Sequence, residues 1–208
     1  MKLSWMTPSI RKKSNNTGTT LVDLIDDNAS DKNTVHKYLG VYESLMSSKK
    51  YSAKNVLEVG VWKGGSIKLW HDYFPNATIY GLDRLLAETT SKVDIFNKPR
   101  IKLYTPTDAY DEETFKRNFL DKNIKCDVLV DDGPHYLETM KAFVRMYSQI
   151  MTDDGILIVE DLDHIEWLDD LRNECPDELK PFIKTYDLRS ISIDQNSILF
   201  IIDKSKTN

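Results

Sequence analysis

The chain lacks the segments that mark a membrane or secreted protein. No apolar run approaches the roughly 20 residues that a helix needs to cross a bilayer. The N-terminal stretch "MKLSWMTPSIRKK" has no apolar centre of the kind found in signal peptides. Only two cysteines are present, Cys126 and Cys175, and they lie too far apart in sequence for a disulfide framework or a metal knuckle. We therefore expect a cytoplasmic protein without a membrane partner.

A surplus of basic residues is also absent. Lys and Arg number 28 against 33 Asp and Glu, which gives a formal net charge of -5 and disfavours a nucleic acid as partner. Hydrophobic residues make up 40% of the 208 residues, as in an ordinary globular protein, and this length favours one main domain. We place that domain at residues 51–208, after an N-terminal arm and helices at residues 1–50.

Strand and helix patterns alternate from Lys54 to the end of the chain. This alternation predicts an α/β fold: an open, mostly parallel sheet of seven strands with helices on both faces. The last two strands are joined by the short link "RSISIDQ", so the final strand is expected to be antiparallel. The predicted strands are "NVLEVG", "ATIYGLD", "RIKLYTPTD", "CDVLVDD", "GILIVEDL", "FIKTYDL" and "NSILFIID".

Two helices are expected before the sheet. "TLVDLIDD" has the pattern of a short helix. The segment "SDKNTVHKYLGVYESLMSSKK" follows, with apolar residues at helical spacing, and either Ser30 or Asp31 is a plausible N-cap.

Polar residues follow the predicted strands at the point where each strand ends. In open sheets of this kind, ligands bind beyond the carboxyl ends of the strands. The sequence therefore predicts one ligand site at that edge. The polar residues and glycines at the strand ends are Glu58, Gly60, Asp83, Thr107, Asp108, Asp131, Asp132, His135, Glu160 and Asp161.

The first strand runs into a glycine-containing turn, "LEVGVWKGGS". Glycines permit a tight turn and a close approach to a ligand, and Asp83 ends the next strand, where a carboxylate can accept the hydroxyls of a ribose. The pyrophosphate pattern G-x-G-x-x-G is missing, since, counted from Gly60, Trp62 stands where the pattern has its second glycine. Glu58 would repel a pyrophosphate but suits a cofactor that carries positive charge, such as S-adenosylmethionine.

These segments resemble a known family. "VLEVGVWKGGSIKLWHDYFPNATIYGLD" resembles motif I and the second strand of class I S-adenosylmethionine-dependent methyltransferases. More narrowly, the sequence resembles the group of macrolide-sugar O-methyltransferases and the cephalosporin hydroxylase family. "SDKNTVHKYLGVYE" is similar to the D-K-x-x-x-H-x-Y segment of that group, and "VDDGPHYLETM" and "GILIVEDL" are similar to its two acidic motifs. The resemblance implies the Rossmann-like class I methyltransferase fold.

The resemblance also implies roles in cofactor binding. The methionine part would lie against Glu58, Gly60, Gly64 and Ser66. Asp83 would hold the ribose, and Asp108 would lie near the adenine. Asp131 would face the amino group of the cofactor, although it could exchange roles with Asp132. Two structural alternatives stay open: Gly64 could only cap a turn, and Asp108 could be the N-cap of the helix at "DEETF".

Three carboxylates at the ends of two strands, Asp132, Glu160 and Asp161, suggest a metal site. Clustered carboxylates repel one another without a cation, and Mg²⁺ prefers such oxygen ligands. Mn²⁺ and Ca²⁺ stay open as alternatives. His135 follows at or near the start of the next helix, where it can remove a proton from an acceptor hydroxyl. The resemblance implies the same roles, although the family reads D-D-G-S-H where this chain has Pro134.

We therefore predict a Mg²⁺-dependent O-methyltransferase that acts on a hydroxyl of a sugar or glycosylated small molecule.

His36 and Tyr38 either form a lid or belong to an amphipathic helix with Tyr38 in the core and His36 exposed. His164 is a candidate for the acceptor pocket. The Glu160 and Asp161 pair could instead be a solvated turn. A homo-oligomer is compatible with the sequence. The alternatives are a metal-independent methyltransferase and a non-catalytic nucleotide-binding module.

Overall fold

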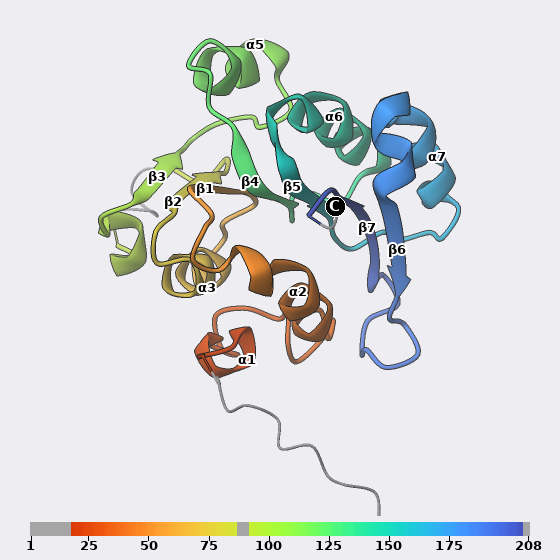
Figure 1. The fold of residues 1–208 in the computed structure, drawn as a ribbon. Helices are drawn as coiled ribbons and strands as arrows, with labels where there is room; N and C mark the ends of the chain where they lie inside the picture. Colours follow the sequence, from red (N-terminus) through yellow and green to blue (C-terminus); the bar gives the residue numbers. More distant parts are fainter. Residues whose placement is uncertain (1–17, 87–91, 206–208) are drawn as a thin grey trace, which may run out of the picture.

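A seven-stranded sheet forms the centre of the molecule in the computed structural model, which describes residues 18–86 and 92–205 (Figure 1). The strand order is β3-β2-β1-β4-β5-β7-β6. Strand β7 pairs antiparallel with both of its neighbours, whereas the other pairings are parallel, so the predicted sheet is confirmed. The strands are β1 (Asn55–Val59), β2 (Thr78–Leu82), β3 (Ile101–Tyr104), β4 (Cys126–Asp131), β5 (Met151–Val159), β6 (Ile183–Asp187) and β7 (Ile198–Asp203).

Helices cover both faces of the sheet (Figure 1). Alternate residues of each strand enter two different hydrophobic clusters: Leu57 and Leu129 lie in one, and Val56 and Val128 lie in the other. The first cluster packs under α5 (Glu112–Phe115), α6 (Leu137–Tyr147) and α7 (Trp167–Glu174). The second packs under α1 (Leu21–Leu24), α2 (Leu39–Met46) and α3 (Gly65–Tyr73).

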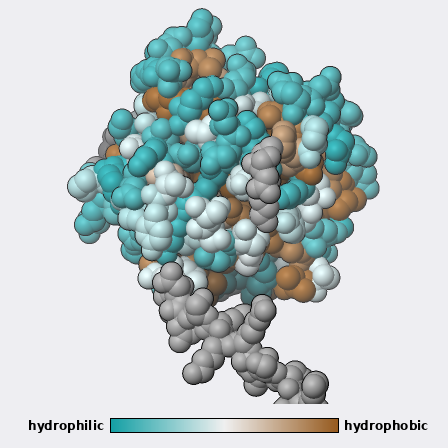
Figure 2. All heavy atoms as spheres, in the orientation of Figure 1, coloured by the Kyte–Doolittle hydropathy of each residue, from teal (hydrophilic) through white to brown (hydrophobic). Residues whose placement is uncertain are grey.

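Short turns of other helix types connect these elements. The 3₁₀ turns are Ser47–Lys49, Asp94–Asn97, Ser148–Ile150 and Asp177–Phe182, and a π-helical turn covers Lys116–Leu120. No helix in the described residues is long and apolar enough to cross a membrane. Hydrophilic residues predominate on the face shown in Figure 2, interrupted by small hydrophobic patches.

The segment before the sheet differs from its prediction. Helix α1 forms as expected and begins with a capping box between Thr20 and Asp23. Helix α2, however, begins only at Leu39, so the N-cap predicted at Ser30 or Asp31 is wrong. The physical reason is Lys37, whose backbone is left-handed (φ 62°) and interrupts a helix at that point. The segment Ser30–Lys37 therefore forms irregular turns. The arm predicted at residues 1 to about 18 lies almost entirely outside the described residues.

The switch in strand order lies between β1 and β4, because the chain leaves β1 toward β2 on one side and returns to β4 on the other. Ligands of open α/β sheets bind at such a point, beyond the carboxyl ends of the strands. Gly60 shows how close the strand ends are: a Cβ added to it would collide with the backbone carbonyl of Asp132. The topology thus predicts a ligand site at the carboxyl ends of β1 and β4.

Candidate active site

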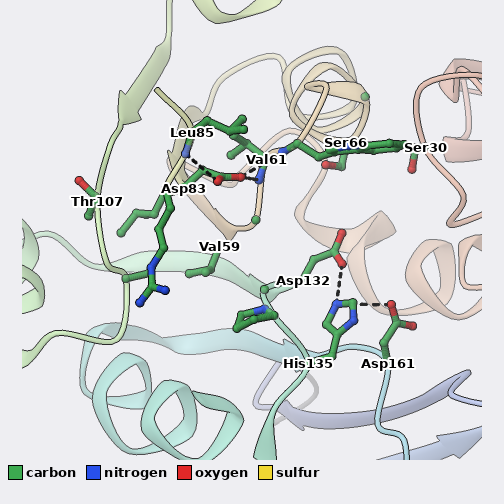
Figure 3. Close-up of a pocket in the computed structure, with 18 of the residues that line it drawn as sticks. Ser30, Val59, Val61, Ser66, Asp83, Leu85, Thr107, Asp132, His135 and Asp161 are labelled. Carbon is green, nitrogen blue, oxygen red and sulfur yellow. Dashed lines mark hydrogen bonds and ion pairs between the residues drawn. The ribbon is translucent and has the colours of Figure 1, made fainter. Parts of the chain in front are cut away.

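A cavity of about 450 Å³ opens at the carboxyl ends of β1, β2 and β4, and this size is typical of small-molecule pockets. The glycine turn after β1 forms one side, and the loops after β4 and β5 form the other (Figure 3). Ala29, Ser30 and Asp31 add a wall from the segment before the sheet. The predicted site residues that line the cavity are Gly60, Ser66, Asp83, Asp132, His135 and Asp161.

The carboxylate of Asp83 holds the glycine turn in shape. Its Oδ2 accepts hydrogen bonds from the backbone N–H groups of Val61 (2.8 Å) and Trp62 (3.1 Å), and its Oδ1 accepts one from Leu85 (3.0 Å; Figure 3). Each carboxylate oxygen has two lone pairs, so the group retains capacity for a ligand hydroxyl. Asp83 can therefore shape the turn and bind a ligand at the same time.

Four of the residues predicted for the cofactor are not in the lining of the cavity, namely Gly64, Asp108, Glu58 and Asp131. Gly64 is the left-handed N-cap of α3 (φ 80°), where a Cβ would run into Ile95 and Phe96, and Gly65 lines the cavity instead. Asp108 forms an ion pair with Arg84. The N-cap of α5 is Asp111, so the alternative that Asp108 caps this helix is wrong.

Glu58 and Asp131 are buried beneath the cavity wall. Ser66 donates a hydrogen bond to Glu58 Oε2 (2.6 Å), so Ser66 stands between Glu58 and the cavity. Burial raises the pKa of Glu58 to about 7, although Lys32 opposes this shift. Burial likewise raises the pKa of Asp131 to about 7.

Tyr110 was not identified from the sequence. Its hydroxyl donates to Asp131 Oδ1 (2.6 Å), and its side chain lines the cavity above that carboxylate. A Cβ on Gly133 would collide with the same hydroxyl, so Gly133 is required for this packing. The only sequence signal was its position in "PTDAY", directly after a strand end. Asp131 therefore faces Tyr110, whereas the next residue, Asp132, lines the cavity.

Asp132, His135 and Asp161 form a compact group in which one ligand atom from each lies within 4.8 Å of the others. His135 Nε2 lies 3.3 Å from Asp132 Oδ1 and 3.6 Å from Asp161 Oδ2 (Figure 3). His135 and Asp161 both have left-handed backbones (φ 56° and 57°). Such conformations cost on the order of 1–3 kcal/mol each in residues other than glycine and cluster at functional sites.

The loop that carries His135 agrees with the prediction that this residue lies at or near the start of the next helix. His135 lies before α6, whose N-cap is Tyr136, and is therefore outside the first helical turn. Pro134 accordingly stands in the loop and lines the cavity beside it.

The charges in this group influence one another strongly. Burial disfavours the charged form of His135, but the hydrogen bond to Asp132 and the charge of Asp161 raise its pKa above the usual value. Burial and the neighbouring Asp132 raise the pKa of Asp161. Burial also opposes ionisation of Asp132, but Lys32 and His135 outweigh it and lower the pKa of that carboxyl. Asp132 therefore carries a negative charge at neutral pH.

Lys32 was also missed by the sequence reading, although it belongs to the D-K-x-x-x-H-x-Y segment. Its side chain is only 2% exposed, and its Nζ lies 2.6 Å from Asp132 Oδ2 and 2.5 Å from Glu160 Oε2. The hydroxyl of Tyr42 donates to the other oxygen of Glu160. Glu160 is thus outside the group formed by Asp132, His135 and Asp161. Glu160 and Asp161 are both buried, so the solvated-turn alternative is wrong.

His36 and Tyr38 both contact the carboxylate of Asp161. Their rings stack with centroids 5.1 Å apart, and both side chains are buried, so the alternative with His36 exposed is wrong. Tyr38 donates to Asp161 Oδ1, and His36 Nδ1 lies 3.2 Å from the same oxygen. His164 is exposed and packs its ring edge-on against Trp167, 5.2 Å between centroids, outside the cavity lining.

Comparisons with known proteins agree with this architecture. No family model matches the chain. It is 27% identical over 145 residues to a tetracenomycin rhamnosyl 3'-O-methyltransferase of Streptomyces olivaceus, which covers 64% of this chain and 34% of that protein. It is 26% identical to L-olivosyl-oleandolide 3-O-methyltransferase of Streptomyces antibioticus, over 61% of this chain and 33% of the relative. The chain thus spans about a third of the length of these curated relatives.

Solved structures give the same result for the fold. The methyltransferase MycE in complex with Mg and SAH aligns with a TM-score of 0.61 at 20% identity, over 83% of this chain and 52% of that chain. These similarities confirm the resemblance to class I S-adenosylmethionine-dependent methyltransferases, with sugar O-methyltransferases among the relatives, and they confirm the predicted fold.

Proposed function

We propose that this protein transfers a methyl group from S-adenosylmethionine to a hydroxyl of a sugar carried by a small molecule, with the help of Mg²⁺ or Mn²⁺. The observation that carries the proposal is the continuity of one cavity. It joins the glycine turn and Asp83 on one side to Asp132, His135 and Asp161 on the other. The sugar O-methyltransferases among the relatives support the choice of acceptor.

The cofactor would occupy the side of the cavity next to the glycine turn. Asp83 would accept hydrogen bonds from the ribose hydroxyls. Gly60 and Ser66 would lie against the methionine part, and the buried carboxylate of Glu58 behind Ser66 would favour its positive charge. Thr107 and Ala109 line the wall where the adenine would lie, beside the predicted Asp108.

The donor set fits a divalent cation on the opposite side. Asp132 and Asp161 offer carboxylate oxygens, which Mg²⁺ and Mn²⁺ prefer, within 4.8 Å of each other and of the His135 ring. Glu160 stands behind Asp132, where Lys32 and Tyr42 already occupy both of its oxygens. A bound divalent cation would supply one thing to the chemistry, a lower pKa for an acceptor hydroxyl next to it.

The residues of the chain would then position and deprotonate the acceptor. His135 would accept the proton of the hydroxyl at the ring nitrogen that is not hydrogen-bonded to Asp132 as the methyl group is transferred, because this ring lines the cavity where acceptor and cofactor would meet. The hydrogen bond to Asp132 fixes the ring. The hydroxyl would have to lie in line with the sulfonium, and the cavity walls would impose that alignment.

One observation favours a second candidate, a metal-independent methyltransferase. Lys32 already places a positive charge between Asp132 and Glu160, so part of the carboxylate repulsion is relieved without a metal ion. In that case His135 and the cavity walls would act without a divalent cation.

The test is methyl transfer from S-adenosylmethionine to a panel of rhamnosylated and olivosylated polyketides, followed by mass spectrometry. We expect a methylated product that disappears in EDTA and returns with Mg²⁺. Activity that survives EDTA would select the metal-independent candidate. If calorimetry detects no binding of S-adenosylmethionine and no acceptor is methylated, the protein is a non-catalytic module.

A further inference from the structure

The ammonium group of Lys32 lies inside a corner formed by three carboxylates. Its Nζ is 2.5 Å from Glu160, 2.6 Å from Asp132 and 3.6 Å from Glu58. Glu58, Glu160 and the lysine are almost fully buried. Lysine is rarely buried to this extent, and an ammonium away from water is tolerated only when acids pair with it. This placement therefore indicates a specific role for Lys32.

The corner is separate from the group that faces the cavity. Lys32 contacts Oδ2 of Asp132, whereas Oδ1 of the same carboxylate faces His135. The outer oxygens of Glu160 and Glu58 are bound by the hydroxyls of Tyr42 and Ser66. Lys32 itself is not among the residues that line the cavity. Asp132 thus divides its two oxygens between the buried corner and the cavity.

We propose that Lys32 is a built-in cation that takes the place of a metal ion in the corner formed by Glu58, Asp132 and Glu160. Carboxylate oxygens converging on one point are the ligands that Mg²⁺ and Mn²⁺ prefer. The ammonium of Lys32 donates hydrogen bonds to two of these carboxylates, Asp132 and Glu160, and its charge lies 3.6 Å from the third, Glu58. Because Lys32 fills this corner, a divalent cation is confined to the cavity side, with Oδ1 of Asp132 and with Asp161. Only this last consequence rests on the proposed function.

The proposal predicts that removal of the ammonium creates a new divalent-cation site. We expect Lys32→Ala to bind one more Mn²⁺ per chain than the wild type, counted by equilibrium dialysis and the electron paramagnetic resonance signal of free Mn²⁺. Lys32→Arg keeps the charge and should leave the number unchanged.

Lys49→Ala is the matched control. Lys49 is also buried, but its partner is the exposed Asp154 at the other end of β5. Its removal leaves no convergent carboxylates, so no additional Mn²⁺ should bind. An extra ion in this variant as well would mean that any lost lysine increases Mn²⁺ binding, and it would overturn the proposal.

Thermal unfolding provides a second measurement. With EDTA, Lys32→Ala should unfold at a lower temperature than the wild type, because the buried Glu58 and Glu160 and the partly exposed Asp132 are left without their cation. Mn²⁺ should raise its unfolding temperature by more than it raises that of the wild type, since an ion that binds only the folded state stabilises it. Lys32→Gln, which keeps two N–H donors without the charge, serves as the milder variant.

Three outcomes separate this proposal from the proposed function. If Lys32→Ala or Lys32→Gln folds but binds no more Mn²⁺ than the wild type, Lys32 does not stand in for a metal ion. If both variants stay unfolded even with Mn²⁺, the proposal also fails, because the ion should replace the ammonium. If the wild type binds no Mn²⁺ and Lys32→Ala binds one, Lys32 has the proposed role. The proposed methyl transfer would then not involve a divalent cation.

Discussion

The two ends of the sheet treat charge differently. At the amino end of β5, each buried charge has one partner of opposite sign near the surface: Lys49 pairs with Asp154, which is 67% exposed, and Asp203 pairs with Lys184, which is 37% exposed. At the carboxyl ends of β1, β4 and β5, the acids outnumber the lysines. Among residues 18–86 and 92–205, Lys32 is the only lysine that pairs with them, together with His36 and His135. The acids there are Glu58, Asp131, Asp132, Glu160 and Asp161.

This difference distinguishes the carboxyl ends of the strands as the part of the molecule suited to bind a positively charged ligand. Isolated ion pairs near solvent contribute little beyond local stability. A surplus of buried carboxylates is unfavourable on its own, and it persists only where a cation or a proton compensates it. The carboxyl end therefore has an excess of carboxylates, whose negative charge a sulfonium cofactor and a divalent cation would compensate.

The largest expected effect is at Asp132, the residue shared by the buried corner and the cavity. We expect Asp132→Asn to lower kcat/KM for methyl transfer by about 10²–10⁴-fold, because it weakens the hold on both the cation and the His135 ring. Asp153→Asn, at the exposed amino end of β5, is the matched control and should remain fully active. If Asp132→Asn and Asp153→Asn lost kcat/KM equally, the carboxyl end of the sheet would be no more important for activity than the amino end.

A smaller loss is expected when the proposed base is removed. His135→Ala should lower kcat by about 10²-fold and leave the dissociation constant of S-adenosylmethionine unchanged, since the ring lies on the acceptor side. His71→Ala is the control, because His71 pairs with Asp72 on α3, away from the cavity lining. Unchanged kcat in His135→Ala would assign this ring a purely structural role.

A moderate effect is expected on the cofactor side. Asp83→Asn retains an oxygen for the N–H groups of Val61 and Trp62 but loses the charge that strengthens hydrogen bonds to the ribose. We expect S-adenosylmethionine to bind roughly tenfold more weakly, in line with about 1.5 kcal/mol for a charged hydrogen bond. Calorimetry measures this directly. Binding as tight as that of the wild type would show that Asp83 only shapes the turn.

The smallest effect is expected at the amino end. Asp203→Asn should leave activity unchanged and lower stability by about 1 kcal/mol or less at neutral pH, since Lys184 is partly exposed. Burial opposes ionisation of Asp203, but Lys184 and Ser205 lower its pKa below 3.8. Its stabilisation is therefore present above pH 3.8 and is lost as the pH falls through the lowered pKa. Urea unfolding of both proteins should differ at neutral pH and converge in acid.

Much of the fold was predictable because it depends on local patterns. Alternating strand and helix segments gave the sheet and its antiparallel last strand. The rule that ligands bind at strand ends brought Asp132, His135, Glu160 and Asp161 together in the prediction. The structure groups them in the same way except for Glu160, which is bound by Lys32 and Tyr42 instead. Asp131 and Asp132 could not be ordered from sequence, because consecutive residues of an extended chain point to opposite sides. Packing against Tyr110 decides which of the two faces the cavity.

Lys32 could not be placed from sequence for a different reason. Its partners Asp132 and Glu160 lie 100 and 128 residues further along the chain, and a lysine in a polar segment is normally exposed. The same distant contacts explain the late start of α2, since the segment that holds Lys32 and His36 turns toward the strand ends instead of continuing as a helix.

The most direct test of the central claim is the number of Mn²⁺ ions bound per chain by the wild type and by Asp132→Asn. The account predicts one ion in the wild type, one in the Asp153→Asn control and none in Asp132→Asn. A wild-type protein that binds no Mn²⁺ and transfers methyl groups at full rate in EDTA would contradict it.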